Sequence, residues 1–293
     1  VNKLLPVPQA WFLSITRVLI LAACVKFNVG SFIYSWFTND HNGLEKTAGE
    51  VLIKFMKEYG EFEFDFAKNQ LKRKVDNGSY IDFLINETDM NLDEIMSDIA
   101  LAVIAGTNTT SKALEYAFVL LSQNVFIQEQ IYNEIKEIDD HMNNITKASV
   151  LRAFIQEVLR LSVVSPLGMP HEATKNIEID GYSIPKGAII HNNMYYIHRK
   201  AQGQDKLDNN VHLEYWLDEN GKFKMDNTKF MLFSYGGRGC PGRPIAMKLM
   251  YYVLSTLIMK YKFISVNNED IKQRFGTVPI IEPQIGIKLQ KRE

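Results

Sequence analysis

The sequence predicts a mainly α-helical protein with a minor β component, and three observations support this expectation. Apolar residues recur at helical spacing over most of the 293-residue chain. Alternating apolar residues around Asp180-Gly181 and Pro185-Lys186-Gly187 instead indicate short strands joined by turns. Hydrophobic residues make up 46% of the chain and charged residues 23%, the balance of a globular protein with a sizeable core. We expect a single domain over residues 1–293.

The N-terminal segment contains an unbroken apolar run from Val18 to Val25, flanked by Arg17 and Lys26. A membrane helix needs about 20 apolar residues, and this run is shorter. No clear cleavage motif marks a signal peptide. A buried core helix is therefore favoured over a membrane segment.

Five further segments have helical periodicity, and these are residues 41–78, 91–124, 125–138, 148–162 and 244–260. The second is the longest, and Asn91 with Glu94 forms a candidate capping box at its start. Its apolar face consists of Leu92, Ile95, Ile99, Val103, Leu114 and Phe118. Residues 202–229 are polar and irregular, and residues 277–290 indicate strand and turn.

Charge and cysteine usage exclude several classes of function. The formal net charge is −1 and the pI about 6.7, so no basic field for nucleic acid is indicated. Cys24 and Cys240 are the two cysteines, too few for a disulfide framework, and a reducing compartment is expected. The six histidines are scattered, without the His/Cys spacing of a zinc site.

The stretch LFSYGGRGCPGRPIA, residues 232–246, places Cys240 in an unusually rigid and polar loop. Its glycines permit close approach to the backbone, and its prolines suit the start of a helix. A thiolate here would lie near the positive end of that helix and near Arg238, and both favour the charged form. Such a thiolate could be a nucleophile or a metal ligand. No local histidine partner supports the nucleophile, and ligation of a haem iron fits better.

The same loop resembles the haem-binding signature FxxGxRxCxG of the cytochrome P-450 family, with matches at Phe233, Gly236, Arg238, Cys240 and Gly242. The resemblance implies that Cys240 is the axial ligand of the iron of haem b and that Arg238 binds a haem propionate. Phe233 would pack near the sulfur, and Gly236 and Gly242 would belong to the cofactor-binding loop.

The stretch QEVLR supplies Glu157 and Arg160, which match the family's ExxR motif. Residues at this spacing share a helix face. A solvated surface pair is the alternative, but the position upstream of the cysteine loop favours a buried structural network. The family also has an arginine just before an aromatic residue in this network. Here Tyr215 precedes Trp216, which puts the support of the loop in question.

The stretch AGTNTT, residues 105–110, interrupts the longest expected helix with glycine and polar residues. A helix kink is one interpretation. The resemblance implies instead a groove for dioxygen at Gly106 and proton delivery by Thr109. Asn108 stands where the family usually has an acid, and an amide cannot exchange a proton at neutral pH.

The stretch that begins at Pro166 resembles the family segment that borders the substrate cavity and reaches a haem propionate. His171 occupies the propionate-binding place, although it could simply be a surface histidine. Ser165, Pro166 and Leu167 would face the substrate.

Residues 12–29 resemble helix E of the family, so the resemblance covers the chain from about that helix onward. The N-terminal third, with its membrane anchor and the Trp–Arg propionate clamp, is expected to be missing, and neither Trp11 with Arg17 nor Trp36 matches that clamp.

The implied activity is monooxygenation of a small apolar substrate with dioxygen and electrons from an NADPH-dependent reductase. The protein is expected to be a monomer on the cytosolic face of the endoplasmic reticulum membrane. A non-catalytic remnant that does not retain haem is the alternative. A membrane-anchored helical protein without a cofactor is a third interpretation.

Overall fold

The computed structural model describes residues 62–65, 70–73, 80–200, 210–225, 230–267, 271–274, 280–282 and 285–292. The predicted helix over the Val18–Val25 run lies outside these residues. Contacts divide the chain into two compact units, with a boundary between Thr107 and Asn108. The single domain expected from the sequence stays a prediction.

The first unit contains a short hairpin that corrects the helix expected over residues 41–78. β1 (Phe62–Asp65) pairs antiparallel with β2 (Gln70–Arg73), and Glu63 lies opposite Lys72. The segment FEFD alternates apolar and acidic residues, a strand period that the helical interpretation of the longer segment overlooked. The rest of that expected helix lies outside the described residues.

Two helices follow the hairpin, α4 (Tyr80–Asn86) and α5 (Leu92–Gln123). The capping box expected at the start of α5 is confirmed. The amide of Asn91 donates to the Glu94 carboxylate at 2.8 Å, and the amide of Glu94 donates to the Asn91 side-chain oxygen at 3.1 Å. Both of these backbone donors at the start of the helix are thereby satisfied.

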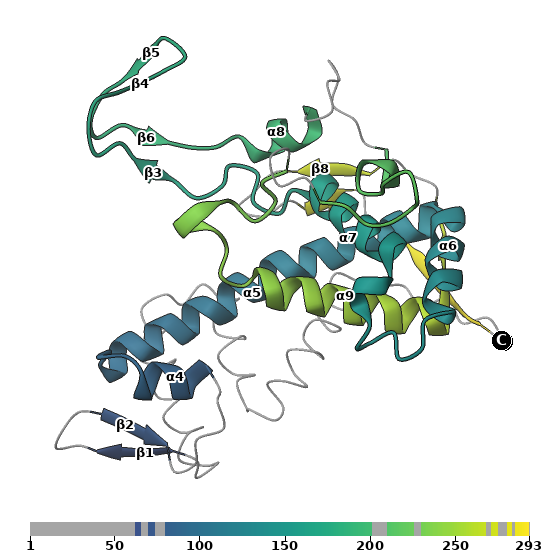
Figure 1. The fold of residues 1–293 in the computed structure, drawn as a ribbon, viewed down its shortest axis with the longest axis horizontal. Helices are drawn as coiled ribbons and strands as arrows, with labels where there is room; N and C mark the ends of the chain where they lie inside the picture. The colour runs from purple at the N-terminus through teal and green to yellow at the C-terminus, as the bar shows by residue number, and fades with distance from the viewer. Residues whose placement is uncertain are drawn as a thin grey trace. The chain divides into compact units, whose positions relative to one another are not determined.

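The second unit is built on helices, as Figure 1 shows. After the C-terminal part of α5 come α6 (Val125–Lys136), α7 (Ser149–Ser162), α8 (Met194–Lys200) and α9 (Arg243–Lys260). Three short 3-10 turns accompany them, at Ile145–Lys147, Leu213–Tyr215 and Gly236–Arg238. α9 packs against α6 and α7, and α7 also contacts α6 and α8.

α7 is the most deeply buried of these helices. Residues 151 and 153–162 are all buried. Its first turn has no side-chain cap of its own, and Glu134 of α6 supplies one. The Glu134 carboxylate accepts the amides of Val150 and Leu151 at 2.9 and 3.1 Å. The start of α7 is thus fixed from a neighbouring helix, which matters because α7 carries Glu157 and Arg160.

The strands of the second unit form two-stranded antiparallel pairs. β3 (His171–Glu172) pairs with β6 (Ile189–Ile190), and β4 (Ile177–Ile179) with β5 (Tyr182–Ile184). β7 (Tyr261–Ser265) pairs with β10 (Ile287–Lys291), and β8 (Lys272–Arg274) with β9 (Ile280–Glu282). The strands expected around Asp180-Gly181 and near the C-terminus are therefore present.

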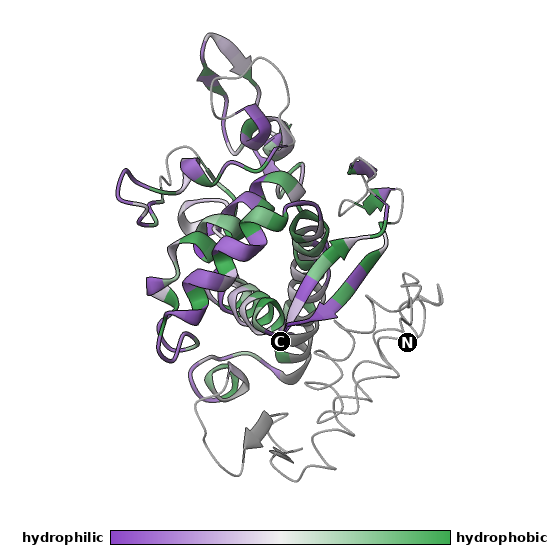
Figure 2. Cartoon of the chain, turned by 90° about the vertical axis from the view of Figure 1, so that its right-hand side faces the viewer, coloured by the Kyte–Doolittle hydropathy of each residue, from purple (hydrophilic) through white to green (hydrophobic). Residues whose placement is uncertain are grey.

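The described residues thus form a mainly α-helical fold with small sheets, as the sequence predicts. Figure 2 shows hydrophobic and hydrophilic stretches side by side along the helices, and mostly hydrophilic loops. Within the part of the chain that the structure describes, no helix combines the length and the apolarity needed to cross a membrane.

Candidate functional site

The cysteine loop, defined here as residues 230–242, has a backbone fixed by its own hydrogen bonds. The amide of Ser234 donates to the carbonyl of Met231 at 2.9 Å, and that of Gly239 to Gly236 at 3.0 Å. Ser234 and Gly236 have positive φ angles of 61° and 67°. Glycine adopts such angles without strain, so Gly236 suits its position, whereas Ser234 is held there by the surrounding bonds.

Cys240 lies near the end of this loop, and its thiol is free and exposed. Its amide donates to the carbonyl of Phe233 at 2.8 Å, which ties the end of the loop to its beginning. α9 starts three residues later, with Pro244 in its first turn as the sequence predicts. A side chain at Gly242 would place its Cβ 3.8 Å from the sulfur of Cys240. This distance is an ordinary van der Waals contact, so the sulfur lies beside Gly242.

Gly239 has a different reason to be glycine. A Cβ at Gly239 would lie 3.1 Å from the carbonyl oxygen of Gly236, which is closer than ordinary packing allows. At Gly237, in contrast, a Cβ would meet nothing within 4 Å. The four glycines that the sequence groups together thus have different roles, and only some of them are required by the loop itself.

Arg238 and Phe233, two further predicted residues, lie on this loop. Arg238 ends the 3-10 turn and is exposed. Phe233 is partly buried, and the guanidinium carbon of Arg243 lies 5.8 Å from the centre of its ring. Sequence reasoning missed this cation–π contact. Its only signal is the basic residue placed directly after the CxG segment.

The residues present fit a large flat cofactor that is held by one thiolate. The sulfur is exposed, and the space beside Gly236 and Gly237 is open. Tyr235 and Ile245, which flank the cysteine by five residues on either side, are 76% and 74% exposed. The loop and the first turn of α9 thus each carry an exposed apolar side chain.

Glu157 and Arg160 form a buried ion pair rather than a solvated surface pair. Their side chains are 0% and 1% exposed. The guanidinium contacts the carboxylate through two parallel bonds, Nε to Oε1 and Nη2 to Oε2, each 2.8 Å long. Nη2 also donates to the carbonyl of Asn210 at 2.9 Å. A buried pair of this kind is tolerated only when its remaining lone pairs and protons are satisfied.

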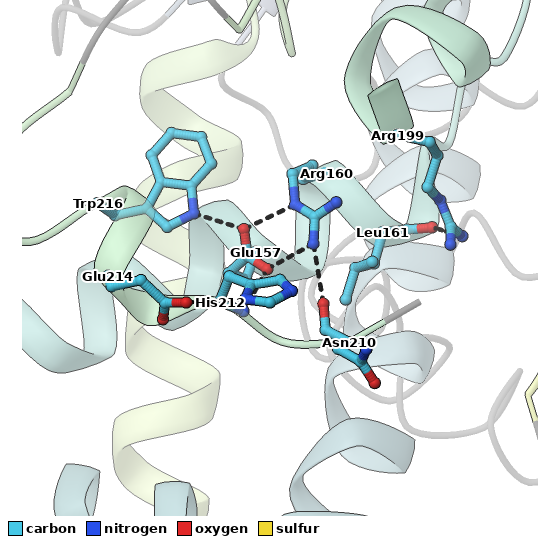
Figure 3. Close-up of polar contacts among 8 residues, drawn as sticks. All are labelled: Glu157, Arg160, Leu161, Arg199, Asn210, His212, Glu214 and Trp216. Carbon is cyan, nitrogen blue, oxygen red and sulfur yellow. Dashed lines mark hydrogen bonds and ion pairs between the residues drawn. The ribbon is translucent and has the colours of Figure 1, made fainter. Parts of the chain in front are cut away.

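Two further donors complete the carboxylate of Glu157, as Figure 3 shows. The indole Nε1 of Trp216 donates to Oε1 at 2.6 Å, and the amide of His212 donates to Oε2 at 2.8 Å. The Tyr215 ring centre lies 5.6 Å from the guanidinium carbon of Arg160. Both oxygens of Glu157 are therefore satisfied although tyrosine, and not arginine, precedes Trp216. The departure from the family pattern at Tyr215 leaves the ion pair fully hydrogen-bonded.

Gly106, Asn108 and Thr109 all lie on α5, and the helix continues through them without a break. Gly106 is exposed, whereas Asn108 and Thr109 are partly buried. The hydroxyl of Ser111 donates to the carbonyl of Asn108 at 3.0 Å, a local bond of the kind that competes with the helix ladder. The boundary between the two units falls within this stretch, so the groove predicted at Gly106 stays a prediction.

His171 lies on β3, opposite Ile190 of β6, and is partly buried. Ser165 accepts the amide of Gly168 at 3.1 Å in a turn that precedes this strand. Leu167 in the same turn is 56% exposed. The structure thus places these residues on an element separate from the cysteine loop, and their roles at a cofactor or substrate stay predictions.

Two buried residues of α8 were not predicted from the sequence. Arg199 donates to the carbonyl of Leu161 at the end of α7 at 2.6 Å. His198 is 2% exposed, and neither of its ring nitrogens has a hydrogen-bond partner among the described residues. Burial, and then the positive charge of Arg160, lower the pKa of His198 to about 4. The sequence did not indicate this burial, because three basic residues at the end of a helix (residues 198–200) are more typical of a solvated helix end.

Within the described residues, this fold and site define a mainly α-helical protein that presents a free cysteine on a glycine-rich loop and contains a buried Glu–Arg ion pair. A family model for cytochrome P-450 matches residues 9–290. The chain therefore belongs to the cytochrome P-450 family, and membership implies a haem cofactor.

The chain is similar to curated relatives from plants and an amoeba. Cytochrome P-450 CYP82J17 of Trigonella foenum-graecum is 27% identical, with 82% of this chain and 48% of the relative covered. Probable cytochrome P-450 513F1 of Dictyostelium discoideum is 30% identical, with 76% and 45% covered. (+)-Menthofuran synthase of Mentha piperita is 29% identical, with 81% and 50% covered. The chain spans about half the length of the curated relatives it matches.

Proposed function

We propose that this chain forms the haem-binding part of a cytochrome P-450 monooxygenase, in which the thiolate of Cys240 would hold the iron of haem b. The exposed thiol of Cys240 carries the proposal, because its backbone is fixed by the bond to Phe233 while its side chain is exposed. A thiolate in this position needs no second protein ligand to hold a haem iron.

The loop residues would orient the cofactor. Arg238 and His171 would each pair with a propionate through a charge-assisted hydrogen bond. Phe233 would pack beside the sulfur and limit access of water to it, and Gly236 would leave room for the ring. When bound, the haem would supply the redox chemistry that transfers one atom of dioxygen to an organic substrate.

The family resemblance assigns the three predicted residues on α5 to dioxygen and to proton delivery. Gly106 would leave space for dioxygen, and the hydroxyl of Thr109 would hold and pass on a proton. Asn108 would hydrogen-bond without exchanging a proton, because an amide is not ionised near neutral pH. A bound water would then have to bring the proton to Thr109.

The partners in this proposal follow from the family resemblance. They are an NADPH-dependent reductase, dioxygen and a small apolar substrate, whose binding segment would include Ser165, Pro166 and Leu167. The protein would act as a monomer at the cytosolic face of the endoplasmic reticulum membrane.

The test is a spectrum of the reduced protein with carbon monoxide. The full chain is produced with excess haem, and a strongly red-shifted Soret band is expected. Cys240→Ser should abolish this band and leave the helical circular dichroism unchanged. Cys24→Ser is the matched control and should retain the band.

Two results would contradict the proposal. Failure of the chain to take up haem would favour the remnant that does not retain it. Survival of the red-shifted band in Cys240→Ser would show that another residue is the ligand.

A further inference from the structure

We infer that Trp216 is a positioning residue for Cys240, and that its indole N–H performs the task for which the family uses an arginine. The inference rests on the proposed function, because it concerns the residue proposed to bind the haem iron. It is carried by two sets of contacts that Trp216 makes, one to α7 and one to the cysteine loop.

The first set of contacts completes a buried carboxylate. Glu157 accepts four hydrogen bonds, two on each oxygen, from Arg160, His212 and Trp216. The bond from Trp216 is the shortest of them, at 2.6 Å, and Trp216 is 0% exposed. Without this donor, Oε1 would retain Arg160 alone in a site that water does not reach, and an unsatisfied buried acceptor is costly.

The second set of contacts leads to the cysteine. The Trp216 ring lies 4.2 Å from the ring of Phe230, centre to centre, and both are buried in one cluster with Ala153 of α7. Leu232 packs against the same cluster. The next residue, Phe233, accepts the amide of Cys240. A continuous series of contacts therefore connects Glu157, through Trp216 and the start of the loop, to the backbone of Cys240.

The charge of this network differs from that expected with an arginine before the aromatic residue. With Tyr215 at that place, the donors to Glu157 other than Arg160 are an indole and an amide among the described residues, and both are neutral. The Tyr215 ring instead faces the guanidinium of Arg160, at 5.6 Å. An arginine at position 215 would add one positive charge close to Arg160.

The test uses amide hydrogen exchange of the haem-free full chain, read by mass spectrometry on peptides from residues 230–242. Trp216→Phe keeps an aromatic ring against Phe230 but has no N–H. We expect roughly tenfold faster exchange in the cysteine loop, because a hydrogen bond to a charged group is lost. Exchange in β4 and β5, which among the described strands pair with each other alone, should change by less than about twofold.

Tyr251→Phe is the matched control. Tyr251 is buried in the same unit and donates one hydrogen bond, to the carbonyl of His141 at 3.0 Å. Its loss removes a buried donor without touching the contacts of Trp216. Exchange in residues 230–242 should therefore stay within about twofold of the unaltered chain.

A rescue variant separates the effect of the lost hydrogen bond from the effect of the changed side-chain volume. Tyr215→Arg combined with Trp216→Phe restores the arginine-aromatic order of the family and offers Glu157 a new donor. This double variant should return exchange in the cysteine loop to within about twofold of the unaltered chain. If Trp216→Phe does not fold, the double variant alone tests the inference. A folded double variant whose cysteine loop exchanges as slowly as in the unaltered chain supports the inference. A double variant that fails to fold overturns it.

Unchanged exchange in Trp216→Phe, or no rescue by Tyr215→Arg, would overturn the inference and leave the proposed function intact. The same experiments also show the opposite outcome, in which the inference holds and the proposed function fails. Loss of protection with rescue, in a chain that shows no Cys240-dependent Soret band, would support the role of Trp216 in the loop and contradict haem ligation.

Discussion

The side chain of Gln128 on α6 pairs with the backbone of Phe263 on β7 as a neighbouring strand would. The amide of Phe263 donates to Oε1 of Gln128 at 2.7 Å, and Nε2 donates to the carbonyl of Phe263 at 3.0 Å. Nε2 also reaches the carbonyl of Leu121, near the end of α5, at 3.2 Å. Gln128 is 1% exposed, so water cannot replace these bonds. One side chain thus connects two helices to the edge of a strand pair.

Replacing Gln128 with leucine should destabilise the protein by about 2–4 kcal/mol, because two buried backbone groups of Phe263 would lose their partners. The measurement is urea unfolding followed by circular dichroism. Gln130→Leu, at an exposed position of the same helix, is the control and should change stability by less than about 0.5 kcal/mol. Equal stability of both variants would show that the Gln128 bonds contribute nothing.

Gly239→Ala and Gly237→Ala form a second matched pair, two positions apart in the cysteine loop. The methyl group added at position 239 would approach the backbone oxygen of Gly236 to 3.1 Å, and backbone atoms cannot move aside as a flexible side chain can. We expect a loss of about 1–3 kcal/mol for Gly239→Ala. Gly237→Ala places its methyl group in open space and should stay within about 0.5 kcal/mol of the parent.

Thermal unfolding of the two alanine variants, in the same buffer, provides the comparison. A larger loss for Gly237→Ala than for Gly239→Ala would contradict the close approach of position 239 to the Gly236 carbonyl.

His198 should make stability depend on pH. Its pKa in the folded protein is lowered to about 4, by burial first and then by Arg160, whereas an unfolded histidine titrates near 6.5. The unfolded chain therefore binds a proton more readily than the folded one. The contribution of His198 is complete above pH 6.5 and is lost as the pH falls through about 4. The full loss is about 3 kcal/mol.

The measurement is the free energy of unfolding at pH 7 and at pH 4.5, compared with His198→Gln. The variant should lose about 2–3 kcal/mol less than the parent between these two pH values, because glutamine does not titrate. His191→Gln, at an exposed histidine, is the control for the exchange of histidine for glutamine itself. An identical pH dependence in His198→Gln would mean that His198 titrates alike in both states.

Much of the helical framework could be predicted from the sequence because its signals are local. Residues 91–124 have apolar periodicity and a capping box, and α5 begins and ends within one residue of these bounds. α7 and α9 likewise follow the predicted segments closely. The hairpin of β1 and β2 was missed because four residues of alternation were averaged into a longer helical pattern.

The support of the cysteine loop could be predicted only in part, because its contacts join residues far apart in the chain. The i,i+3 spacing of Glu157 and Arg160 places them on one helix face. Nothing local reveals that Trp216, 59 residues after Glu157, would donate to it. The same holds for His198, whose burial depends on packing against distant residues and could not be inferred from the basic residues beside it.

The bond from Arg199 to the carbonyl of Leu161 has a consequence for how this chain can vary in length. The bond closes a segment of 38 residues that contains both β3–β6 and the β4–β5 hairpin. The entropy lost on closing such a segment rises only with the logarithm of its length, by about 0.6 kcal/mol for each doubling. Insertions at the tip of the β4–β5 hairpin should therefore be thermodynamically cheap. The tip of this hairpin can therefore change in length while α7 keeps its contacts with α6 and α9.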